Sequence, residues 1–383
     1  MDITLRKINV LFIGSDMKIF EEGSDANRRM KEYGTLANRL DIAVYNGNIF
    51  MGSEDDAYKV SSNVFAYPRA LWGLFSLFKI RTWRLSFVLN HKIDLVSPQD
   101  PFVFGFLGYA IARWLGVPLQ LQVHTDLLSP YFRKESLKNR IYVFIAKYLL
   151  PRANGIRVVS NKIKESIVKE IKLKVEPEVL PIWINTETTK ISQVKTDLRK
   201  KYPQFENIIL MASRITVEKN ISMAIEVVGN IIKKFNKTGL IIVGEGPLKK
   251  KFEEEVLNFG LEKNVIFEPW SDDLPSYYRT ADIFLNTSNY EGYGRTIVEA
   301  LAVGTPVITT DVGCAEEVIQ NKKNGYIIPV NGKDELLDCL NEFIGDKKIK
   351  EEMKKAVKDI GLKLMSKNEY LDGYLKGWLD SLK

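Results

Sequence analysis

Cysteine and histidine are scarce in this chain of 383 residues, and their scarcity excludes several kinds of site. Two cysteines, Cys314 and Cys339, cannot form the disulfide framework that supports many small secreted domains. With His91 and His124 as the only histidines, no set of residues has the spacing of a zinc site. The sequence therefore predicts a protein of the reducing cytosol that holds no structural metal.

Long apolar segments and a recognisable leader are missing as well. The segment 102–123 is interrupted by Arg113 and Pro118, and the segment 68–91 carries three basic residues in its middle. Neither segment therefore predicts a membrane span. The opening residues, MDITLRKINVLFIGSD, place charged residues before a short apolar stretch, so we expect no secretory signal. The expected location is the cytoplasm.

Basic residues are in excess, and the excess is local. The net charge is +7, from 55 Lys and Arg against 48 Asp and Glu, and residues 131–174 alone hold 12 basic and three acidic residues. One interpretation is a solvated helix surface, which is what most charge runs are. The other is a surface that rests on the inner leaflet of an anionic membrane, together with the apolar segment Leu71–Val88. Nucleic acid is not expected as a partner, because no binding motif accompanies the charge.

Apolar strands and helical segments alternate along the chain, which favours parallel sheets in an α/β fold. The first half predicts strands at Ile8–Ile13, Ile42–Tyr45, Leu95–Ser97, Leu119–Val123 and Gly155–Val159. The second half predicts strands at Ile208–Ala212, Gly239–Val243, Val265–Glu268, Ile283–Asn286, Pro306–Thr309 and Gly325–Ile328. Because the length exceeds one ordinary core, we expect two domains of similar architecture.

The expected domains are residues 1–187 and 188–367. They are divided in a polar connection, where the apolar residues follow neither the helical nor the strand period. The last segment, 368–383, predicts a helix whose Tyr370, Tyr374 and Trp378 share one apolar face at a spacing of four. We expect this helix to pack back on the first domain.

Residues suited to chemistry follow several strands of the second half, where open parallel sheets bind their ligands. SRITVEKN follows the first of these strands and carries Arg214 and Lys219, and GEGP follows the second and begins with Gly244. NYEGYGRT follows the fourth and carries Glu291 before a helix that contains Glu299. Each motif alone is an ordinary turn or a surface charge.

Together these motifs predict an anion site. Glycines before a helix let the backbone approach a ligand, and the first turn of the helix presents unpaired N–H groups. The two cations Arg214 and Lys219 suit a diphosphate and can stabilise it as a leaving group without a metal ion. Glu299, one turn into the helix, is placed to accept hydrogen bonds from a ribose, and Glu291 is placed to face a sugar.

The order and spacing of these motifs resemble those of the retaining glycosyltransferases of family four. SRITVEKN, VGEGP, ADIFLNTSNYEGYGRTIVEALAVGTPVITTD and NGYIIP are similar to that family's carboxyl domain, and SPQDPFVFGFLGYAIARWLGVPLQLQVHTD and RANGIRVVSNKIKESI to its acceptor domain. The resemblance implies the GT-B fold, with two Rossmann-like domains whose parallel sheets face each other across a cleft.

The activity implied is transfer of a hexose or N-acetylhexosamine from a nucleoside-diphosphate sugar to a glycan or polyprenyl-linked acceptor, in cell-surface polysaccharide or glycolipid synthesis. No metal or other cofactor is expected. By the resemblance Arg214 and Lys219 bind the diphosphate and take part in catalysis, Glu291 lies near the donor sugar, and Glu299 binds the ribose. The distal phosphate and sugar are expected at Gly294, Arg295 and Thr296.

His124 is the remaining catalytic candidate, because in relatives a histidine at this place reaches the donor sugar from the opposite wall of the cleft. On the acceptor side we expect weaker contributions from Asp126 and from Arg28, with Arg29 beside it, which suit an acceptor phosphate. The loop after the first strand, GSDMKIFEEGSDANRRM, has single glycines where the family commonly has a pair. Two alternatives stay open, namely a nucleotide-sugar epimerase of the same fold and a catalytically silent sugar-binding or scaffold protein.

Overall fold

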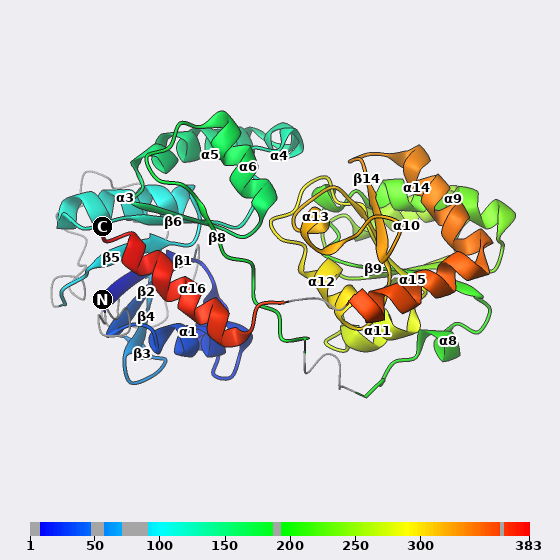
Figure 1. The fold of residues 1–383 in the computed structure, drawn as a ribbon, viewed down its shortest axis with the longest axis horizontal. Coiled ribbons are helices and arrows are strands. Elements are labelled where there is room, and N and C mark those ends of the chain that lie inside the picture. The colour runs from blue at the N-terminus through cyan, green and yellow to red at the C-terminus, as the bar shows by residue number, and fades with distance from the viewer. Residues whose placement is uncertain (1–7, 47–56, 71–90, 187–192, 361–363) are drawn as a thin grey trace.

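The computed structural model of the chain describes residues 8–46, 57–70, 91–186, 193–360 and 364–383. Two α/β domains lie side by side, and Figure 1 shows the first at the left and the second at the right. The chain leaves the first domain after β8 (Glu178–Val179) and returns to it as α16 (Lys367–Asp380), drawn in red. The expected segment Leu71–Val88 lies outside the described residues.

The first domain contains a sheet of five strands in the order β3-β4-β2-β1-β5 and a sheet of three in the order β6-β7-β8. A parallel bridge between Val96 and Leu119 connects the two sheets edge to edge. Every strand pair is parallel except β3 with β4. The strands are β1 (Asn9–Gly14), β2 (Arg39–Asn46), β3 (Tyr58–Lys59), β4 (Val64–Ala70), β5 (Leu95–Pro98), β6 (Gln120–Val123), β7 (Gly155–Val158) and β8.

The second domain contains one parallel sheet in the order β11-β10-β9-β12-β13-β14. The chain runs outward from β9 to β11 and then returns to the other side of β9 at β12. The strand order thus reverses between β9 and β12, and such a switch point opens a crevice at the carboxyl ends of the strands. The strands are β9 (Asn207–Ala212), β10 (Thr238–Val243), β11 (Val265–Glu268), β12 (Ile283–Asn286), β13 (Val307–Thr310) and β14 (Gly325–Ile328).

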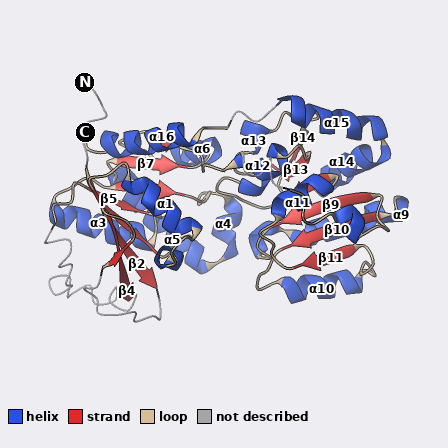
Figure 2. Ribbon diagram, turned by 90° about the horizontal axis from the view of Figure 1, so that it is seen from below, coloured by secondary structure: helices blue, strands red, loops and turns tan. Residues whose placement is uncertain are grey.

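Helices cover both faces of each sheet (Figures 1 and 2). Serine side chains begin several of them: Ser24 accepts from the N–H of Asn27 at the start of α1, and Ser160 from that of Ile163 at the start of α6. The longer helices are α1 (Asp25–Gly34), α3 (Val103–Leu115), α5 (Leu137–Leu149), α6 (Asn161–Glu170), α9 (Ile221–Lys234), α10 (Lys249–Asn258), α12 (Arg295–Ala302), α14 (Lys333–Gly345), α15 (Lys347–Ile360) and α16. The shorter ones are α4 (Pro130–Glu135), α8 (Leu198–Lys201), α11 (Leu274–Thr280), α13 (Ala315–Val318) and the 3₁₀ segments η2 (Met17–Phe20), η5 (Leu150–Arg152) and η6 (Val217–Lys219).

The helix α16 belongs to the core of the first domain. Its Tyr370, Tyr374 and Trp378 are buried in one cluster with residues of β1, β2 and α1. The Tyr370 hydroxyl lies 2.7 Å from the Tyr33 hydroxyl of α1, and the rings of Tyr33 and Tyr374 are stacked with centroids 4.3 Å apart. A capping box formed by Ser366 and Glu369 begins the helix. The end of the chain therefore completes the domain in which the chain begins.

The α/β class and the two parallel sheets predicted from the sequence are confirmed. The expected strands agree with the observed ones to within a few residues, because continuous apolar runs between turn signals are typical of strands buried on both faces. The seven-residue β4, the short β3 and β8, and the antiparallel pairing of β3 with β4 were not expected. No helix within the described residues is both long and apolar enough to cross a bilayer.

Candidate active site

The loops after β9 and β12 meet at the switch point of the second domain. Lys219 Nζ lies 2.6 Å from Glu291 Oε1, and both side chains are largely buried, at 12% and 16% exposed. Ser288 Oγ also donates to Glu291 Oε1, at 2.9 Å. Thr287 Oγ1 donates to the carbonyl of Lys219 at 2.8 Å, so a hydrogen bond also joins the loop after β12 to the loop after β9. The sequence placed both residues at this edge of the sheet but did not reveal their ion pair.

Arg214 enters the same region from the loop after β9. Its side chain is 78% exposed and forms an ion pair with Glu218, at 3.2 Å along the same loop. Its charge acts on the hydroxyl of Tyr290, which lies in the loop after β12. Arg214 is therefore an exposed cation at the mouth of the crevice, whereas Lys219 is a buried one in its wall.

The helix α12 begins at the crevice, and its first turn has no side-chain cap. Its N-cap is Gly294, whose φ of 90° lies in the left-handed region, and no side chain caps the helix. The first N–H groups and the positive end of the helix dipole are thus available to an anion. Arg295 is exposed and Thr296 half-buried, and both belong to this first turn.

Glu299 lies one turn further along α12 and is only 17% exposed. Burial raises the pKa of its carboxyl, while Arg295 at 3.4 Å and the hydroxyl of Tyr278 at 3.3 Å favour the charged form. Burial, followed by the charge of Glu299, raises the pKa of Tyr278 well above its usual value. The carboxylate is therefore held in place and retains acceptor capacity for a ligand diol.

Close backbone packing at Gly244 leaves no room for a side chain. A Cβ at this position would lie 1.9 Å from the carbonyl oxygen of Ser213, because the turn after β10 crosses close to the loop after β9. The N–H of Ile215 donates to the carbonyl of Glu245 at 2.9 Å across the same contact. The turn thus supports the loop that carries Arg214 and Lys219.

The loop after β12 also rests on the first domain. A Cβ on Gly292 would lie 1.9 Å from the carbonyl oxygen of His124, and Ser160 Oγ donates to the carbonyl of Gly292 at 2.9 Å. The rings of Phe132 and Tyr290 meet edge to face with centroids 5.5 Å apart. The two domains therefore touch at the point where their strand ends face each other.

His124 follows β6 and is half-buried in the wall of the first domain. Its Nε2 lies 3.3 Å from Gln122 Oε1. Burial, followed by the charges of Arg157 and Arg29, lowers the pKa of the ring to about 3. The ring is uncharged at neutral pH, so it can donate or accept a hydrogen bond but does not supply a proton as an imidazolium.

The two acceptor-side candidates, Asp126 and Arg28, are engaged by neighbouring residues. Asp126 accepts a hydrogen bond from Ser166 Oγ at 3.1 Å, and burial raises the pKa of its carboxyl. Arg28 is exposed, and it donates to the carbonyl of Gly23 at 2.8 Å and pairs with Asp25. Neither residue lines the cavity described next.

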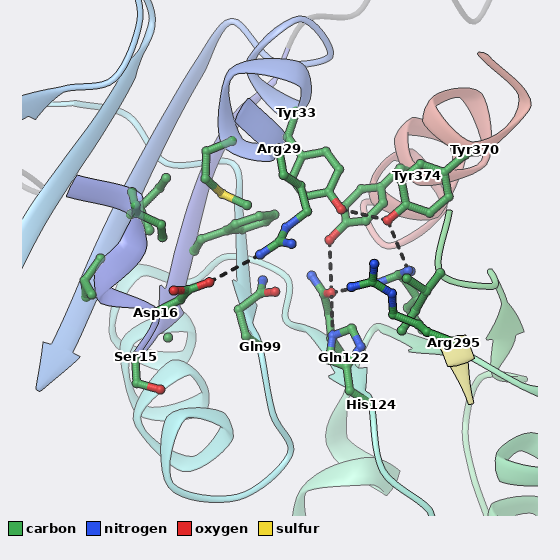
Figure 3. Close-up of a pocket in the computed structure, with 18 residues that line it drawn as sticks. Ser15, Asp16, Arg29, Tyr33, Gln99, Gln122, His124, Arg295, Tyr370 and Tyr374 are labelled. Carbon is green, nitrogen blue, oxygen red and sulfur yellow. Dashed lines mark hydrogen bonds and ion pairs between the residues drawn. The ribbon is translucent and has the colours of Figure 1, made fainter. Parts of the chain in front are cut away.

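A cavity of about 400 Å³ lies at the carboxyl ends of the strands of the first domain. Figure 3 shows Arg29 and Asp16 near one another, and Gln122 and His124 together on another side. Arg295 of the second domain completes the lining. The remaining lining residues are Phe12, Gly14, Ser15, Ile19, Met30, Tyr33, Ile42, Val44, Gln99, Arg157, Ile182, Tyr370 and Tyr374. Sequence reasoning missed Arg157 as a site residue, and its one signal was a charge inside the apolar strand GIRVVS.

No group of three or more His, Cys, Asp or Glu side chains suited to a metal occurs in the part of the chain that the structure describes. The charges available to a diphosphate in the crevice are those of Arg214, Lys219 and the α12 terminus. A metal-independent reaction remains a prediction.

Two Rossmann-like domains whose strand ends face each other, with cations and a bare helix terminus at one switch point, define the GT-B class of nucleotide-sugar enzymes. The family model for glycosyl transferases group 1 matches residues 194–360, and the model for glycosyltransferase family 4 matches residues 37–188. The chain belongs to this retaining glycosyltransferase family. The family predicted from the sequence is confirmed.

Several known proteins are similar to this chain. The alpha-monoglucosyldiacylglycerol synthase of Streptococcus pneumoniae is 27% identical over 254 residues, which are 63% of this chain and 57% of that protein. The UDP-Gal:alpha-D-GlcNAc-diphosphoundecaprenol alpha-1,3-galactosyltransferase of Escherichia coli is 24% identical over 335 residues, 85% of this chain and 81% of that one. The sucrose-phosphate synthase structure from Thermosynechococcus elongatus superimposes with a TM-score of 0.76 at 17% identity, over 97% of this chain and 99% of that one.

Proposed function

We propose that this protein transfers a hexose or N-acetylhexosamine from a nucleoside-diphosphate sugar to a hydroxyl of a glycan or lipid-linked acceptor. The observation that carries the proposal is the ion pair of Lys219 with Glu291 at the switch point of the second domain, 2.6 Å long. In this proposal Lys219 is the fixed cation for the diphosphate, and Glu291 beside it is the carboxylate that faces the sugar. The diacylglycerol and diphosphoundecaprenol enzymes described above are both named for lipid substrates, which supports a role in glycolipid or cell-surface polysaccharide synthesis.

In the proposed reaction the bond between the anomeric carbon of the sugar and the diphosphate oxygen breaks. Lys219, Arg214 and the N–H groups at the start of α12 stabilise the negative charge that develops on the diphosphate. The acceptor hydroxyl attacks the same face of the sugar and gives its proton to the departing diphosphate oxygen, so the configuration is retained. Glu291 and the neutral His124 position the sugar from opposite sides of the crevice.

The remaining residues of the donor site have binding roles in this proposal. Glu299 accepts hydrogen bonds from the ribose diol, and Arg295 and Thr296 lie where the distal phosphate and the sugar reach the first turn of α12. The turn at Gly244 keeps the loop of Arg214 and Lys219 close to the ligand. Since two cations and a helix terminus neutralise the diphosphate, the reaction needs no metal ion.

We further propose that the enzyme works at the cytoplasmic surface of an anionic membrane. The outer face of α5 carries Leu137, Ile141, Phe144 and Tyr148, which are 42% to 74% exposed and lie on one side of the helix. Exposed basic residues flank this apolar stripe: Lys134, Lys138, Arg140 and Lys147. An apolar stripe bordered by cations matches the interface of an anionic leaflet, where apolar burial and charge attraction act together.

A thermal-shift panel of UDP, GDP and ADP with their sugars tests the donor. A nucleotide at 100 times its dissociation constant raises the free energy of unfolding by about 2.7 kcal/mol, which is a measurable shift. We expect one nucleotide series to stabilise the protein, with the nucleotide sugar at least as effective as the diphosphate. Absence of stabilisation by any nucleotide would contradict the proposal.

Two rival functions are separated by a second assay. A nucleotide-sugar epimerase would convert the donor alone into an isomerised sugar, whereas the proposed transferase slowly hydrolyses the donor and releases the sugar that the donor carried. A silent sugar-binding protein would do neither. Incubation of the best-binding nucleotide sugar with the enzyme, followed by chromatography of the released sugar, therefore distinguishes all three.

A further inference from the structure

Arg157 is a buried cation without an acidic partner. It lies in β7 and is 5% exposed, and no carboxylate within the described residues forms an ion pair with it. Its hydrogen bonds go to Gln122 Oε1 at 3.0 Å, the carbonyl of Leu180 at 3.2 Å and the hydroxyl of Tyr370 at 3.4 Å. Its Nε has no partner in the described part of the chain.

These neutral groups orient the guanidinium but do not cancel its charge. The ring of Tyr374, whose centroid is 4.7 Å away, contributes a cation–π contact. An arginine is always charged, and a buried charge is costly unless it is paired. Because the side chain lines the cavity of the first domain, an anion in that cavity would supply the missing partner.

The other charges of the cavity lining add to the excess. Three arginines line it, namely Arg29, Arg157 and Arg295, against a single carboxylate, Asp16. Asp16 is 3.4 Å from Arg29 and also accepts from the N–H of Lys18 at the start of η2, at 3.1 Å. His124 is neutral. The formal charge of the lining is therefore +2, and it stays positive when Arg295 is set against Glu299, its partner at 3.4 Å, so the cavity suits the negative charge of a phosphate ester.

The cavity also has the shape and position of a ligand site. Its volume of about 400 Å³ is in the range of small-molecule pockets. It lies where the strand order of the first sheet reverses, between β1 and β5, with Ser15 and Gln99 following these two strands. Tyr33 and Tyr370 border it with aliphatic side chains, surfaces that suit a sugar ring or a lipid glycerol.

We propose that this cavity binds the phosphate ester of an anionic acceptor, with Arg157 and Arg29 as the phosphate ligands. That the ligand is the acceptor rests on the proposed transfer reaction. The anion site itself is inferred from the cavity and its charges alone. His124 and Arg295 lie in the same lining, so an acceptor bound there lies beside the donor crevice. The bidentate geometry of the guanidinium suits phosphate oxygens.

Calorimetric titration of the full-length chain tests the site with two phosphate esters, glucose 1-phosphate and dihexanoyl phosphatidylglycerol, and with uncharged methyl glucoside. We expect at least one ester to bind and methyl glucoside to bind much more weakly. The ester that binds identifies the source of the phosphate, a soluble sugar phosphate or a lipid headgroup. In Arg29→Gln its dissociation constant should rise about tenfold or more, because a charge-assisted contact is lost.

Matched variants separate this site from the donor crevice. Lys31→Gln removes the same charge from the same helix, and Lys31 does not line the cavity, so its affinity should stay within about twofold of wild type. Lys219→Ala removes the donor cation and should leave ester binding intact while it weakens nucleotide binding. Failure of nucleotide binding with intact, Arg29-dependent ester binding would contradict the proposed donor reaction and leave the anion site standing.

Three results would overturn the proposal. They are equal loss of affinity in Lys31→Gln and Arg29→Gln, loss in Lys219→Ala but not in Arg29→Gln, and no preference of the wild-type protein for either ester over methyl glucoside. Arg157→Gln should also lose ester binding, with its thermal unfolding measured in parallel. If Arg157→Gln does not fold, the exposed Arg29 decides the question alone, since its side chain is 46% exposed and carries no part of the core.

Discussion

Lys219 Nζ lies 2.6 Å from Glu291 Oε1 and so joins the loops that follow the two strands flanking the switch point. Both residues are largely buried, and Glu291 accepts a second hydrogen bond from Ser288. A diphosphate that enters the crevice offers Lys219 a second anion. The pair therefore fixes the cation before the donor arrives, which reduces the reorganisation needed during the reaction.

Lys219→Ala should lower the rate of donor hydrolysis about 10²- to 10³-fold and weaken nucleotide binding, because the cation serves both the bound and the departing diphosphate. Hydrolysis of the nucleotide sugar selected by the thermal-shift panel is the assay. Lys333→Ala is a suitable control, since Lys333 pairs with Glu226 on the surface of the same domain. A Lys219 variant that folds and keeps wild-type rates would remove Lys219 from the mechanism.

Glu299→Gln and Glu291→Gln should change different kinetic constants. The proposed ribose contact of Glu299 would be made alike in ground and transition states, so its loss should raise the donor KM about tenfold with little change in kcat. In the proposed site Glu291 faces the sugar where charge develops, so its loss should lower kcat about tenfold or more. Steady-state kinetics with varied donor measure both values. A KM effect for Glu291 with unchanged kcat would show that its role is assigned wrongly.

The lowered pKa of His124 should be visible in the acid stability of the protein. An unfolded histidine takes up its proton near pH 6.5, whereas the folded ring does so only near pH 3. Between these values the unfolded state binds more protons, so stability falls as the pH is lowered. From pH 7 to pH 5 this one group should reduce the free energy of unfolding by about 2 kcal/mol.

Denaturant unfolding of wild type and His124→Gln at pH 7 and pH 5 measures this contribution. The variant should lose about 2 kcal/mol less than wild type over the interval, because it has no proton to take up. Parallel losses in the two proteins would mean that the ring titrates normally in the folded state. It would then be available as an acid at neutral pH, contrary to the role given to it here.

The apolar stripe of α5 should mediate membrane binding. Wild type should co-sediment with vesicles that contain phosphatidylglycerol and dissociate as salt rises, since the attraction is screened over about 8 Å at physiological ionic strength. Replacing Ile141 and Phe144 together by serine should reduce this binding strongly. Replacing Leu257 and Phe259, which are 61% and 54% exposed on the second domain, tests the matched control. Equal binding to vesicles of phosphatidylcholine, or equal loss in both double variants, would contradict the membrane proposal.

Much of the fold could be predicted from the sequence because its strands are apolar runs that end at turn residues. The strands Val265–Glu268, Ile283–Asn286 and Gly325–Ile328 were located to the residue for this reason. Strands of two residues, such as β3 and β8, are too short to show an alternation of apolar and polar residues. They form only where the edge of a neighbouring strand is available for pairing. The apolar face at Tyr370, Tyr374 and Trp378 could be seen, but its partner Tyr33 is more than 300 positions away.

The candidate site was less predictable than the fold. The strand-end motifs indicated Arg214, Lys219, Glu291 and Glu299, because parallel strands bring the residues after them to one edge. No local pattern showed that Lys219 and Glu291 pair, since that contact depends on the strand order. Arg157 was counted only within a basic run, because its burial becomes visible only when β7 is placed between neighbouring strands.

The central claim is that this enzyme cleaves a nucleoside-diphosphate sugar with retention and without a metal. Real-time proton NMR of slow donor hydrolysis tests it most directly, with EDTA present and UDP-glucose, UDP-N-acetylglucosamine or GDP-mannose chosen by the thermal-shift panel. The account predicts that the α-linked donor releases the α-sugar first, before mutarotation, and that Lys219→Ala abolishes most of the release. First release of the β-sugar, or a strict requirement for a divalent cation, would contradict it.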